Sequence, residues 1–267
     1  MYLSLFGKQI PLYGVFFWIG ILVAAAVAIF VCKKKKLPLF DLTCSAVYTM
    51  IFAIAGAKIL FILVSLGDII ELAQTIPFGK LLPMIIKGGF VFYGGLIGGV
   101  LGLFVYAKQF KMDFSHLMGI YAVVLPLGHA FGRVGCFFGG CCYGIAYDGP
   151  LSHTYQVATG AAPVGVPLFP VQLLEALCLL LLFGLQMVLL LKNVQKKNIF
   201  VYNYCFCYSI IRFALEFLRG DAERGSFLTI STSQWISIAI MAVVLLFYFK
   251  GDAIKRLLKK DKNADQA

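Results

Sequence analysis

Long apolar runs alternate with short polar segments along the whole chain. A helix needs about 20 apolar residues to cross the hydrocarbon of a bilayer, and each run comes close to that length. The pattern therefore predicts an all-α integral membrane protein with seven transmembrane helices. The expected spans are residues 10–32, 43–66, 90–107, 115–132, 170–191, 199–218 and 233–249.

Basic residues gather in every second connection between these runs. If the Lys33–Lys36 cluster is cytoplasmic, the cytoplasmic segments hold four, two, three and six Lys and Arg residues, 15 of the 23 in the chain. The positive-inside rule then predicts an N-terminus outside and a cytoplasmic C-terminus. The same cluster follows the first run, which is typical of a stop-transfer anchor and not of a cleavable signal. These cytoplasmic segments are residues 33–42, 108–114, 192–198 and 250–267.

Composition agrees with a membrane protein. Hydrophobic residues make up 61% of the chain, whereas the apolar share of a soluble domain is roughly 45–50%. The net charge of +11 is mostly explained by topology, so no nucleic-acid partner is expected. Residues 1–249 are expected to form one membrane domain, followed by a basic cytoplasmic tail at 250–267.

The functional site is expected on the outward side of the membrane. This side holds the loop 67–89, the segment 133–169 and the turn 219–225. The middle segment is longer than a simple connection needs, which is typical of functional loops. Just before it, glycines 128, 132, 135 and 139 form one stripe of a helix, so a ligand or a neighbouring backbone can approach closely there.

Charged residues interrupt the apolar runs at a few positions. Each costs roughly 2.5–3.5 kcal/mol on insertion scales, so each is a candidate functional residue. Arg212 and Glu216 are spaced i,i+4, and Arg219 is expected to continue the same helix face as a polar ladder. The charged positions are Lys58, Arg133, Glu175, Arg212 and Glu216.

The arginines favour an anionic ligand. Arg133 has no acidic residue in its own span, so it needs a carboxylate or an anion from elsewhere. Three arginines also exceed the two buried carboxylates, and a planar guanidinium suits the phosphate of a phospholipid headgroup. The alternatives are that Arg212 and Glu216 only neutralise each other, and that Glu175 and Lys58 are structural.

Two further groups of small residues have simpler interpretations. In GGFVFYGGLIGG, residues 88–99, small residues four apart predict tight helix packing. Three cysteines, at 136, 141 and 142, lie near His129 and His153, but their spacing is not that of a zinc site. Close packing of small residues is expected there and no metal, with a redox role as the alternative.

Several segments together resemble the bacterial prolipoprotein diacylglyceryl transferases. They are LYG near the start, GGFVFYGGLIGG, GHAFGRVGCFFGGCCYG, PVQLLEAL, IRFALEFLRGD and ISTSQWISI, in that order. The resemblance runs from about Tyr13 to Ile240. It implies a seven-span enzyme of the bacterial cytoplasmic (inner) membrane, with its active site toward the outer leaflet.

The resemblance also implies the reaction and its partners. The family moves the diacylglyceryl group of phosphatidylglycerol to the lipobox cysteine of a prolipoprotein signal peptide and releases glycerol phosphate. The expected partners are these two substrates and membrane lipids, with no cofactor, and the protein is expected to be a monomer. A lipid-binding or lipid-translocating relative without this chemistry, and a thiol-redox protein, are the alternatives.

Site residues follow from the matching motif positions. Arg133 and Arg212 would hold the leaving phosphate. The expected catalytic residues are Arg133, Arg212, Glu216 and Tyr93. The expected substrate or lipid-binding residues are Tyr13, Lys58, Gly94, Gly95, Gly98, Cys136, Gly144, Glu175, Arg219 and Gln234.

Three positions depart from the family pattern. Tyr93 stands where many members have a histidine considered a candidate base, Cys136 replaces an asparagine, and Lys58 replaces an arginine. A tyrosine, with a reference pKa of about 10, is a poor base at neutral pH. Glu216, or a thiol whose pKa is lowered by an arginine, would then have to generate the attacking thiolate.

Overall fold

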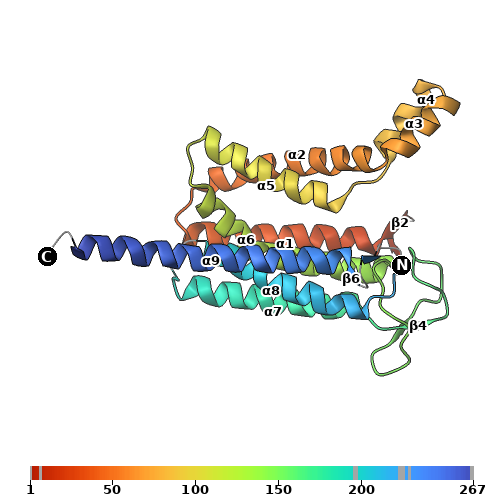
Figure 1. Ribbon diagram of the computed structural model, residues 1–267. Helices are drawn as coiled ribbons and strands as arrows, with labels where there is room; N and C mark the ends of the chain where they lie inside the picture. Colours follow the sequence, from red (N-terminus) through yellow and green to blue (C-terminus); the bar gives the residue numbers. More distant parts are fainter. Residues whose placement is uncertain (1, 6–7, 195–197, 222–225, 228–229, 265–267) are drawn as a thin grey trace. The chain divides into compact units, whose positions relative to one another are not determined.

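The computed structural model describes residues 2–5, 8–194, 198–221, 226–227 and 230–264, most of them helical (Figure 1). The helices are α1 (Leu12–Lys34), α2 (Leu39–Val64), α3 (Leu66–Thr75), α4 (Phe78–Lys87), α5 (Phe92–Gln109), α6 (Phe114–Gly139), α7 (Val171–Leu191), α8 (Ile199–Leu215), the 3-10 turn η1 (Glu216–Leu218) and α9 (Thr232–Ala264).

Three short antiparallel strand pairs accompany the helices and were not predicted. Two of the pairs join strands that are adjacent in the sequence and form hairpins. The third pairs the two ends of a longer loop. The pairs are β1 (Tyr2–Leu5) with β2 (Lys8–Pro11), β3 (His153–Thr154) with β4 (Pro167–Leu168), and β5 (Ser226–Phe227) with β6 (Ile230–Ser231).

The chain forms two compact units. The first unit consists of residues 1–31 and 119–267, and the second of residues 32–118. The first therefore contains nearly all of α1, most of α6, and α7 to α9. The second contains α2 to α5 and the first turn of α6.

Within the described part of the chain, five helices are long and apolar enough to cross a membrane: α1, α2, α6, α7 and the Thr232–Phe249 part of α9. A sixth span results if Gly79–Lys87 and Phe92–Gln109, bent by 78°, are counted as one broken span. The α8 helix, with 17 residues, is shorter than these. The prediction of an all-α membrane protein is confirmed in this form, and the count of seven spans and their orientation stay predictions.

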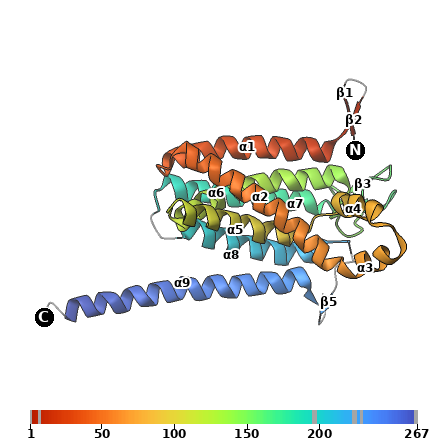
Figure 2. The ribbon, with the colours of Figure 1, turned by 90° about the horizontal axis from the view of Figure 1, so that it is seen from above.

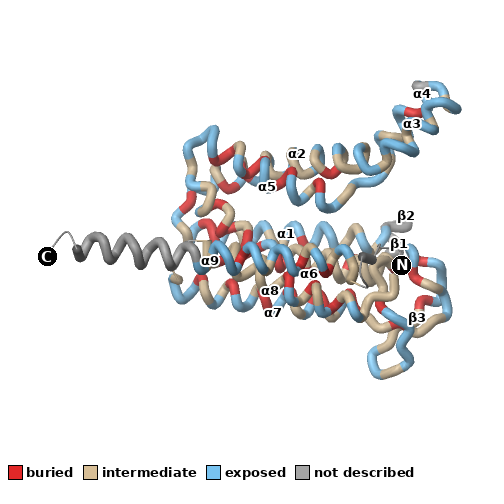
Figure 3. Tube along the Cα trace, in the orientation of Figure 1, coloured by how far each residue is buried: buried red, intermediate tan, exposed pale blue. Residues whose placement is uncertain are grey.

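Many residues along these helices are exposed (Figure 3), and large hydrophobic residues are among them. Trp18 on α1 is 64% exposed, Leu63 on α2 is 60% exposed, and Leu181 on α7 is 67% exposed. Large apolar side chains exposed in this number are unfavourable in water but not in lipid. The exposure pattern is thus the one expected of helices that contact hydrocarbon.

In the first unit, α6, α7 and α8 lie side by side (Figure 2). Small side chains, Ala130 of α6 and Ala176 of α7, pack with Leu179 in one buried cluster. The buried Gln186 amide of α7 donates to the carbonyl of Phe200 at 2.8 Å and to that of Ala122 at 3.4 Å. One polar side chain thereby links all three helices.

In the second unit, α2 and α5 pack through glycines. A Cβ atom on Gly94 would lie 2.4 Å from the carbonyl oxygen of Gly56, and one on Gly98 would lie 2.2 Å from that of Phe52. Only glycine allows backbones to approach this closely. The packing interpretation of the glycine-rich segment is confirmed.

Two boundaries differ from the predicted ones. Residues 67–89 are not a loop: α3 and α4 occupy most of them, separated at Ile76, whose extended backbone is what a residue before a proline prefers. In addition, α6 continues to Gly139, so Arg133 and Cys136 lie on a helix and not in a connecting segment.

Candidate active site

Arg133 is held by a carboxylate from the neighbouring helix. Its Nη2 atom lies 3.0 Å from Oε1 of Glu175 on α7, and Glu175 is only 2% exposed. Tyr208 of α8 donates its hydroxyl hydrogen bond to the same oxygen, at 3.1 Å. Three helices therefore meet in one polar contact, and the expectation that Arg133 finds a carboxylate outside its own span is confirmed.

Arg212 links α8 to α9. Its Nη2 atom lies 2.6 Å from Oε2 of Glu216 and donates to the hydroxyl of Ser233 at 3.0 Å. Arg212 itself is 9% exposed. The i,i+4 ion pair reduces the cost of placing both charges in an apolar environment, so the neutralisation interpretation stays open beside the binding one.

The predicted polar ladder is wrong at Arg219. The helix ends at Leu215, tightens into η1, and reaches Arg219 with extended backbone (φ −88°, ψ 137°). This turn brings the guanidinium to Asp221, with hydrogen bonds of 2.9 Å from Nε and 2.6 Å from Nη2. Burial alone would lower the pKa of Arg219, but Asp221 and Cys142 raise it above its usual value, so the positive charge is fixed.

Gly144 joins the segment after α6 to the end of α8. It forms an isolated antiparallel bridge with Arg219, and the adjacent amide of Ile145 donates to the carbonyl of Leu218 at 3.0 Å. Tyr155 ties the same segment to α6: burial raises the pKa of its hydroxyl to about 12, so it stays protonated and donates to the Phe137 carbonyl at 2.7 Å. The position of Arg219 is therefore set by backbone pairing.

The balance of charge also differs from the prediction. Asp221 supplies a third carboxylate, so each of the three arginines has an acidic partner, and a surplus of cations does not mark the site. Instead, Nε of Arg133 and Nη1 of Arg212 are buried and make no hydrogen bond to any described residue. A buried unsatisfied donor costs roughly 1–3 kcal/mol, which an oxygen atom of a ligand would relieve.

The two arginines converge on the same side chains. Tyr208 lies within electrostatic range of both Arg133 and Arg212, and so does His129 of α6. The His129 and Tyr208 rings meet edge to face with 5.1 Å between centroids. We call Arg133, Glu175, Tyr208, Arg212 and Glu216 the arginine centre.

Two other predicted residues border this part of the first unit. Tyr13, in the first turn of α1, packs its ring against Gly135 and Gly139, where its atoms lie 3.3 and 3.6 Å from the position of a Cβ atom. Two glycines of the predicted stripe, Gly135 and Gly139, thus contact the neighbouring helix α1. Gln234, 5% exposed, accepts a hydrogen bond from the amide of Ser231 at 3.0 Å at the start of α9.

Cys136 belongs to a cluster of thiols at the end of α6. The sulfur atoms of Cys136, Cys141 and Cys142 all lie within 4.8 Å of one another, and none of the three forms a disulfide. The expected close packing of these small side chains is confirmed. Cys141 also lines a cavity of about 330 Å³ together with Tyr13 and Thr159.

The remaining predicted residues lie in the second unit. The Lys58 ammonium donates to the carbonyls of Ile86 and Gly88, both at 3.0 Å, which favours the structural interpretation of this lysine. Tyr93 is 42% exposed and its ring meets Phe92 edge to face. Gly94 and Gly98 serve the contact with α2, while Gly95 has room for a Cβ atom, 3.5 Å from its nearest neighbours.

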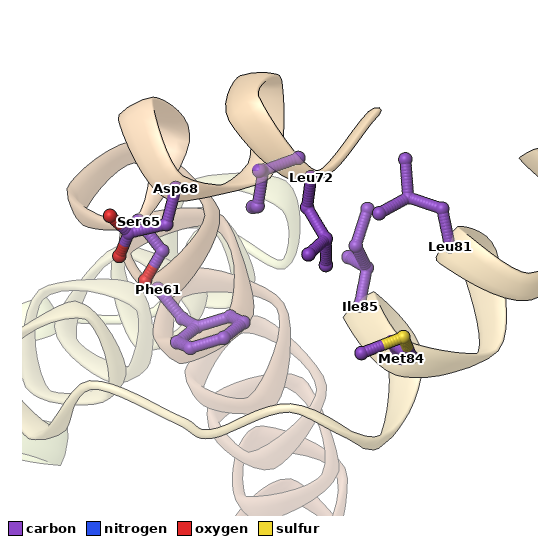
Figure 4. A pocket seen from close by; sticks show the side chains of 8 residues that line it. Phe61, Ser65, Asp68, Leu72, Leu81, Met84 and Ile85 are labelled. Carbon is purple, nitrogen blue, oxygen red and sulfur yellow. The ribbon is translucent and has the colours of Figure 1, made fainter. Parts of the chain in front are cut away.

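A cavity of about 230 Å³ lies between the end of α2, α3 and α4 in the same unit (Figure 4). Apolar side chains such as Phe61, Leu72 and Met84 line it, with Ser65 and Asp68 at one end. None of the predicted site residues borders it.

Sequence reasoning missed three side chains that complete the first unit's polar contacts: Tyr208, Ser233 and Asp221. Tyr208 precedes Arg212 by one helical turn, so an i,i+4 search around each buried arginine would have found it. Asp221 pairs with Arg219 only because the helix ends early. Ser233 lies in the segment ISTSQWISI, but it comes from another helix, and no sequence pattern pairs it with Arg212.

Comparison with known proteins gives one consistent result. The family described as prolipoprotein diacylglyceryl transferase matches residues 1–250. A protein of Clostridium perfringens named phosphatidylglycerol–prolipoprotein diacylglyceryl transferase 2 is 34% identical over 255 residues, which cover 92% of each chain. The correspondingly named transferase of Clostridium tetani is 30% identical over 253 residues, 95% of this chain and 97% of its own.

A third relative, the transferase of Finegoldia magna, is 28% identical over 267 residues, 97% of each chain. The matches thus extend over nearly the full length of both partners, and they include the helices that carry the arginine centre. The chain belongs to the prolipoprotein diacylglyceryl transferase family.

Proposed function

We propose that this chain transfers the diacylglyceryl group of phosphatidylglycerol to the lipobox cysteine thiol of prolipoproteins and releases glycerol phosphate. Membership of the family supports the reaction, and the relatives named above carry both substrates in their names. The proposed partners are phosphatidylglycerol and the signal peptide of a prolipoprotein, without a cofactor or nucleic acid. The protein is proposed to act as a monomer.

One observation carries the assignment of the site. Arg133 and Arg212 come from different helices, both interact electrostatically with Tyr208, and each keeps a buried donor nitrogen without a partner among the described residues. Glu175, Glu216 and Ser233 occupy the other nitrogens and hold both guanidinium planes in place. An oxyanion such as a phosphate supplies the acceptors that these two donors need.

The chemistry follows from that arrangement. The lipobox sulfur forms a bond to the diacylglyceryl carbon, and the bond from this carbon to the phosphate oxygen breaks. The electron pair leaves with glycerol phosphate, whose added negative charge Arg133 and Arg212 stabilise. The thiol proton passes to Glu216, the carboxylate that pairs with Arg212.

The finer topology belongs to the same proposal. Seven spans, an N-terminus outside and a cytoplasmic C-terminus place the ends of α6 and α8 toward the outer leaflet of the bacterial inner membrane. The distribution of lysine and arginine supports this orientation. Labelling of single introduced cysteines with an impermeant maleimide on intact cells tests it: Leu151→Cys should react and Gln195→Cys should not, and the reverse pattern would overturn the topology.

The reaction is tested with purified protein in phosphatidylglycerol-containing detergent micelles and a synthetic lipobox peptide. The expected result is a gain in peptide mass equal to one diacylglyceryl group, located on the cysteine by fragmentation. A peptide with serine at that position is the matched control and should gain nothing. Binding of the lipid with no mass gain on the cysteine peptide would instead support the lipid-binding alternative.

A further inference from the structure

The end of α6 brings two cysteines together through its backbone. The amide of Gly140 donates to the carbonyl of Phe137, and the amide of Cys141 donates to that of Cys136, both at 3.2 Å. These two bonds, with Gly140 at φ +63°, form a Schellman cap, in which the side chains at the positions of Cys136 and Cys141 contact each other. The spacing CFFGGC therefore fixes the distance between two thiols.

The third thiol follows directly. Cys142 also has a left-handed backbone, φ +56°, which turns its side chain back, so that all three sulfur atoms lie within 4.8 Å of one another. Three sulfurs bound to one metal at about 2.3 Å lie about 4 Å apart. The cluster needs only a small closure to reach that geometry.

Positive charge surrounds the cluster on both sides. Arg133 precedes Cys136 by three residues on α6, and Arg219 interacts with the sulfur of Cys142. Each guanidinium also has a carboxylate partner, Glu175 or Asp221. Their N–H groups nevertheless favour negative charge on the nearby sulfur atoms.

The cluster is also accessible. Cys141 lines the cavity of about 330 Å³ that Tyr13, Gly139 and Thr159 border. None of the three cysteines is fully buried, and none is part of the arginine centre. A small ion can therefore reach the sulfurs without unfolding of the cap.

We propose that Cys136, Cys141 and Cys142 form a three-sulfur site for one copper(I) ion. Soft thiolate ligands select copper(I), which does not require four ligands, whereas structural zinc is almost always four-coordinate. Among the described residues the cluster consists of cysteines alone. Binding releases the thiol protons to solvent and oxidises nothing.

The test uses the full-length protein in detergent, kept anaerobic, with copper(I) supplied from a coloured chelator complex. We expect one copper(I) per chain and an X-ray absorption spectrum with three sulfur neighbours. Bound copper(I) should also protect residues 136, 141 and 142 from alkylation, as read by mass spectrometry of the peptides, and should leave Cys44 reactive. Failure to bind copper(I) while these three thiols alkylate freely would overturn the proposal.

Variants locate the site. Cys136→Ser should weaken copper(I) binding by at least about 100-fold, because loss of a ligand exceeds the effect of losing an outer partner. Cys178→Ser on α7 is the matched control and should bind as the parent does. Equal affinity in Cys136→Ser, or a preference for zinc that disappears in His153→Ala, would contradict the three-sulfur copper(I) site.

The copper(I) site does not depend on the proposed transferase reaction. Arg212→Ala removes a residue of the arginine centre but touches none of the sulfurs. This variant should lose transfer and keep copper(I) binding. Copper(I) binding lost with Arg212→Ala would show that the ion sits elsewhere.

Discussion

The arginine centre of the first unit and the glycine contact of the second unit use opposite means to join helices. At the glycine contact, made by Gly56, Gly94 and Gly98, two backbones touch and no side chain intervenes. At the arginine centre, three helices are held by charged and hydroxyl groups that keep two buried donors unpaired. The first arrangement is complete as it stands, whereas the second needs a further acceptor.

The difference distinguishes two kinds of residue in the family motifs: those that pack helices and those that can bind a substrate. The motifs contain both glycines and arginines, but a glycine whose missing side chain is filled by a carbonyl has no room for a substrate. A guanidinium whose buried N–H group has no acceptor can instead bind a substrate by donating a hydrogen bond to it. We therefore expect substitutions at the two places to change different properties.

The largest effect is expected from Arg133→Ala and Arg212→Ala. Each removes a proposed donor to the leaving phosphate, and loss of one such donor reduces turnover roughly 100- to 1000-fold. Turnover is measured by mass gain of a lipobox peptide under saturating phosphatidylglycerol.

The control for this prediction is the amount of folded protein, followed by size-exclusion chromatography in detergent. A loss of turnover with an unchanged folded fraction supports the assigned role. Near-parental turnover in either variant would contradict it, and the arginine centre would then be only a device for helix packing.

Gly98→Leu should instead act on stability. Its Cβ would lie 2.2 Å from the carbonyl oxygen of Phe52, and overpacking typically destabilises by roughly 1–3 kcal/mol. We expect a lower midpoint of thermal unfolding in detergent.

Gly95→Ala is the matched control, because the nearest atoms to its Cβ are 3.5 Å away, and it should unfold at the parental temperature. If Gly98→Leu folded normally but lost transfer, the glycine would serve the substrate and the comparison would fail.

Much of this organisation could be predicted from sequence because it depends on local pattern. The apolar runs predicted the main helices, and glycines at i,i+4 predicted the contact of α5. The need of Arg133 for an outside carboxylate also followed from its surroundings, since a lone buried charge is too costly.

The failures occurred where the structure depends on distant or irregular contacts. The turn at η1 takes Arg219 off the α8 face, and only the backbone bridge to Gly144 explains where it goes. Ser233 reaches Arg212 from another helix. The α3 and α4 helices were read as loop because each has only 10 residues.

A smaller effect is expected from Tyr208→Phe. The change deletes the hydroxyl that donates to Glu175 and leaves the ring in place. A hydrogen bond to a charged group is worth roughly 1.5–3 kcal/mol, part of which water or a rearranged Arg133 recovers. We expect a decrease in turnover of about tenfold, with little change in the unfolding temperature.

A double-mutant cycle with Glu175→Gln provides the control. If Tyr208 acts through the carboxylate, the double variant should be about as active as Glu175→Gln alone. Additive losses would mean that Tyr208 contacts the substrate independently of Glu175.

The smallest effect on transfer is expected at Lys58, a charged residue that belongs with the glycine contact. Its ammonium donates to the carbonyls of Ile86 and Gly88 and lies 4.9 Å from the centroids of the Phe61 and Phe90 rings. Lys58→Met should lower stability by roughly 1.5–3 kcal/mol, the usual net value of a hydrogen bond made by a charged group. Lys58→Arg keeps donors within reach of the same carbonyls and should be neutral in both thermal unfolding and peptide lipidation. If Lys58→Met abolished lipidation while unfolding at the parental temperature, this lysine would act on the substrate, and the second unit would contribute charge as well as packing to the reaction.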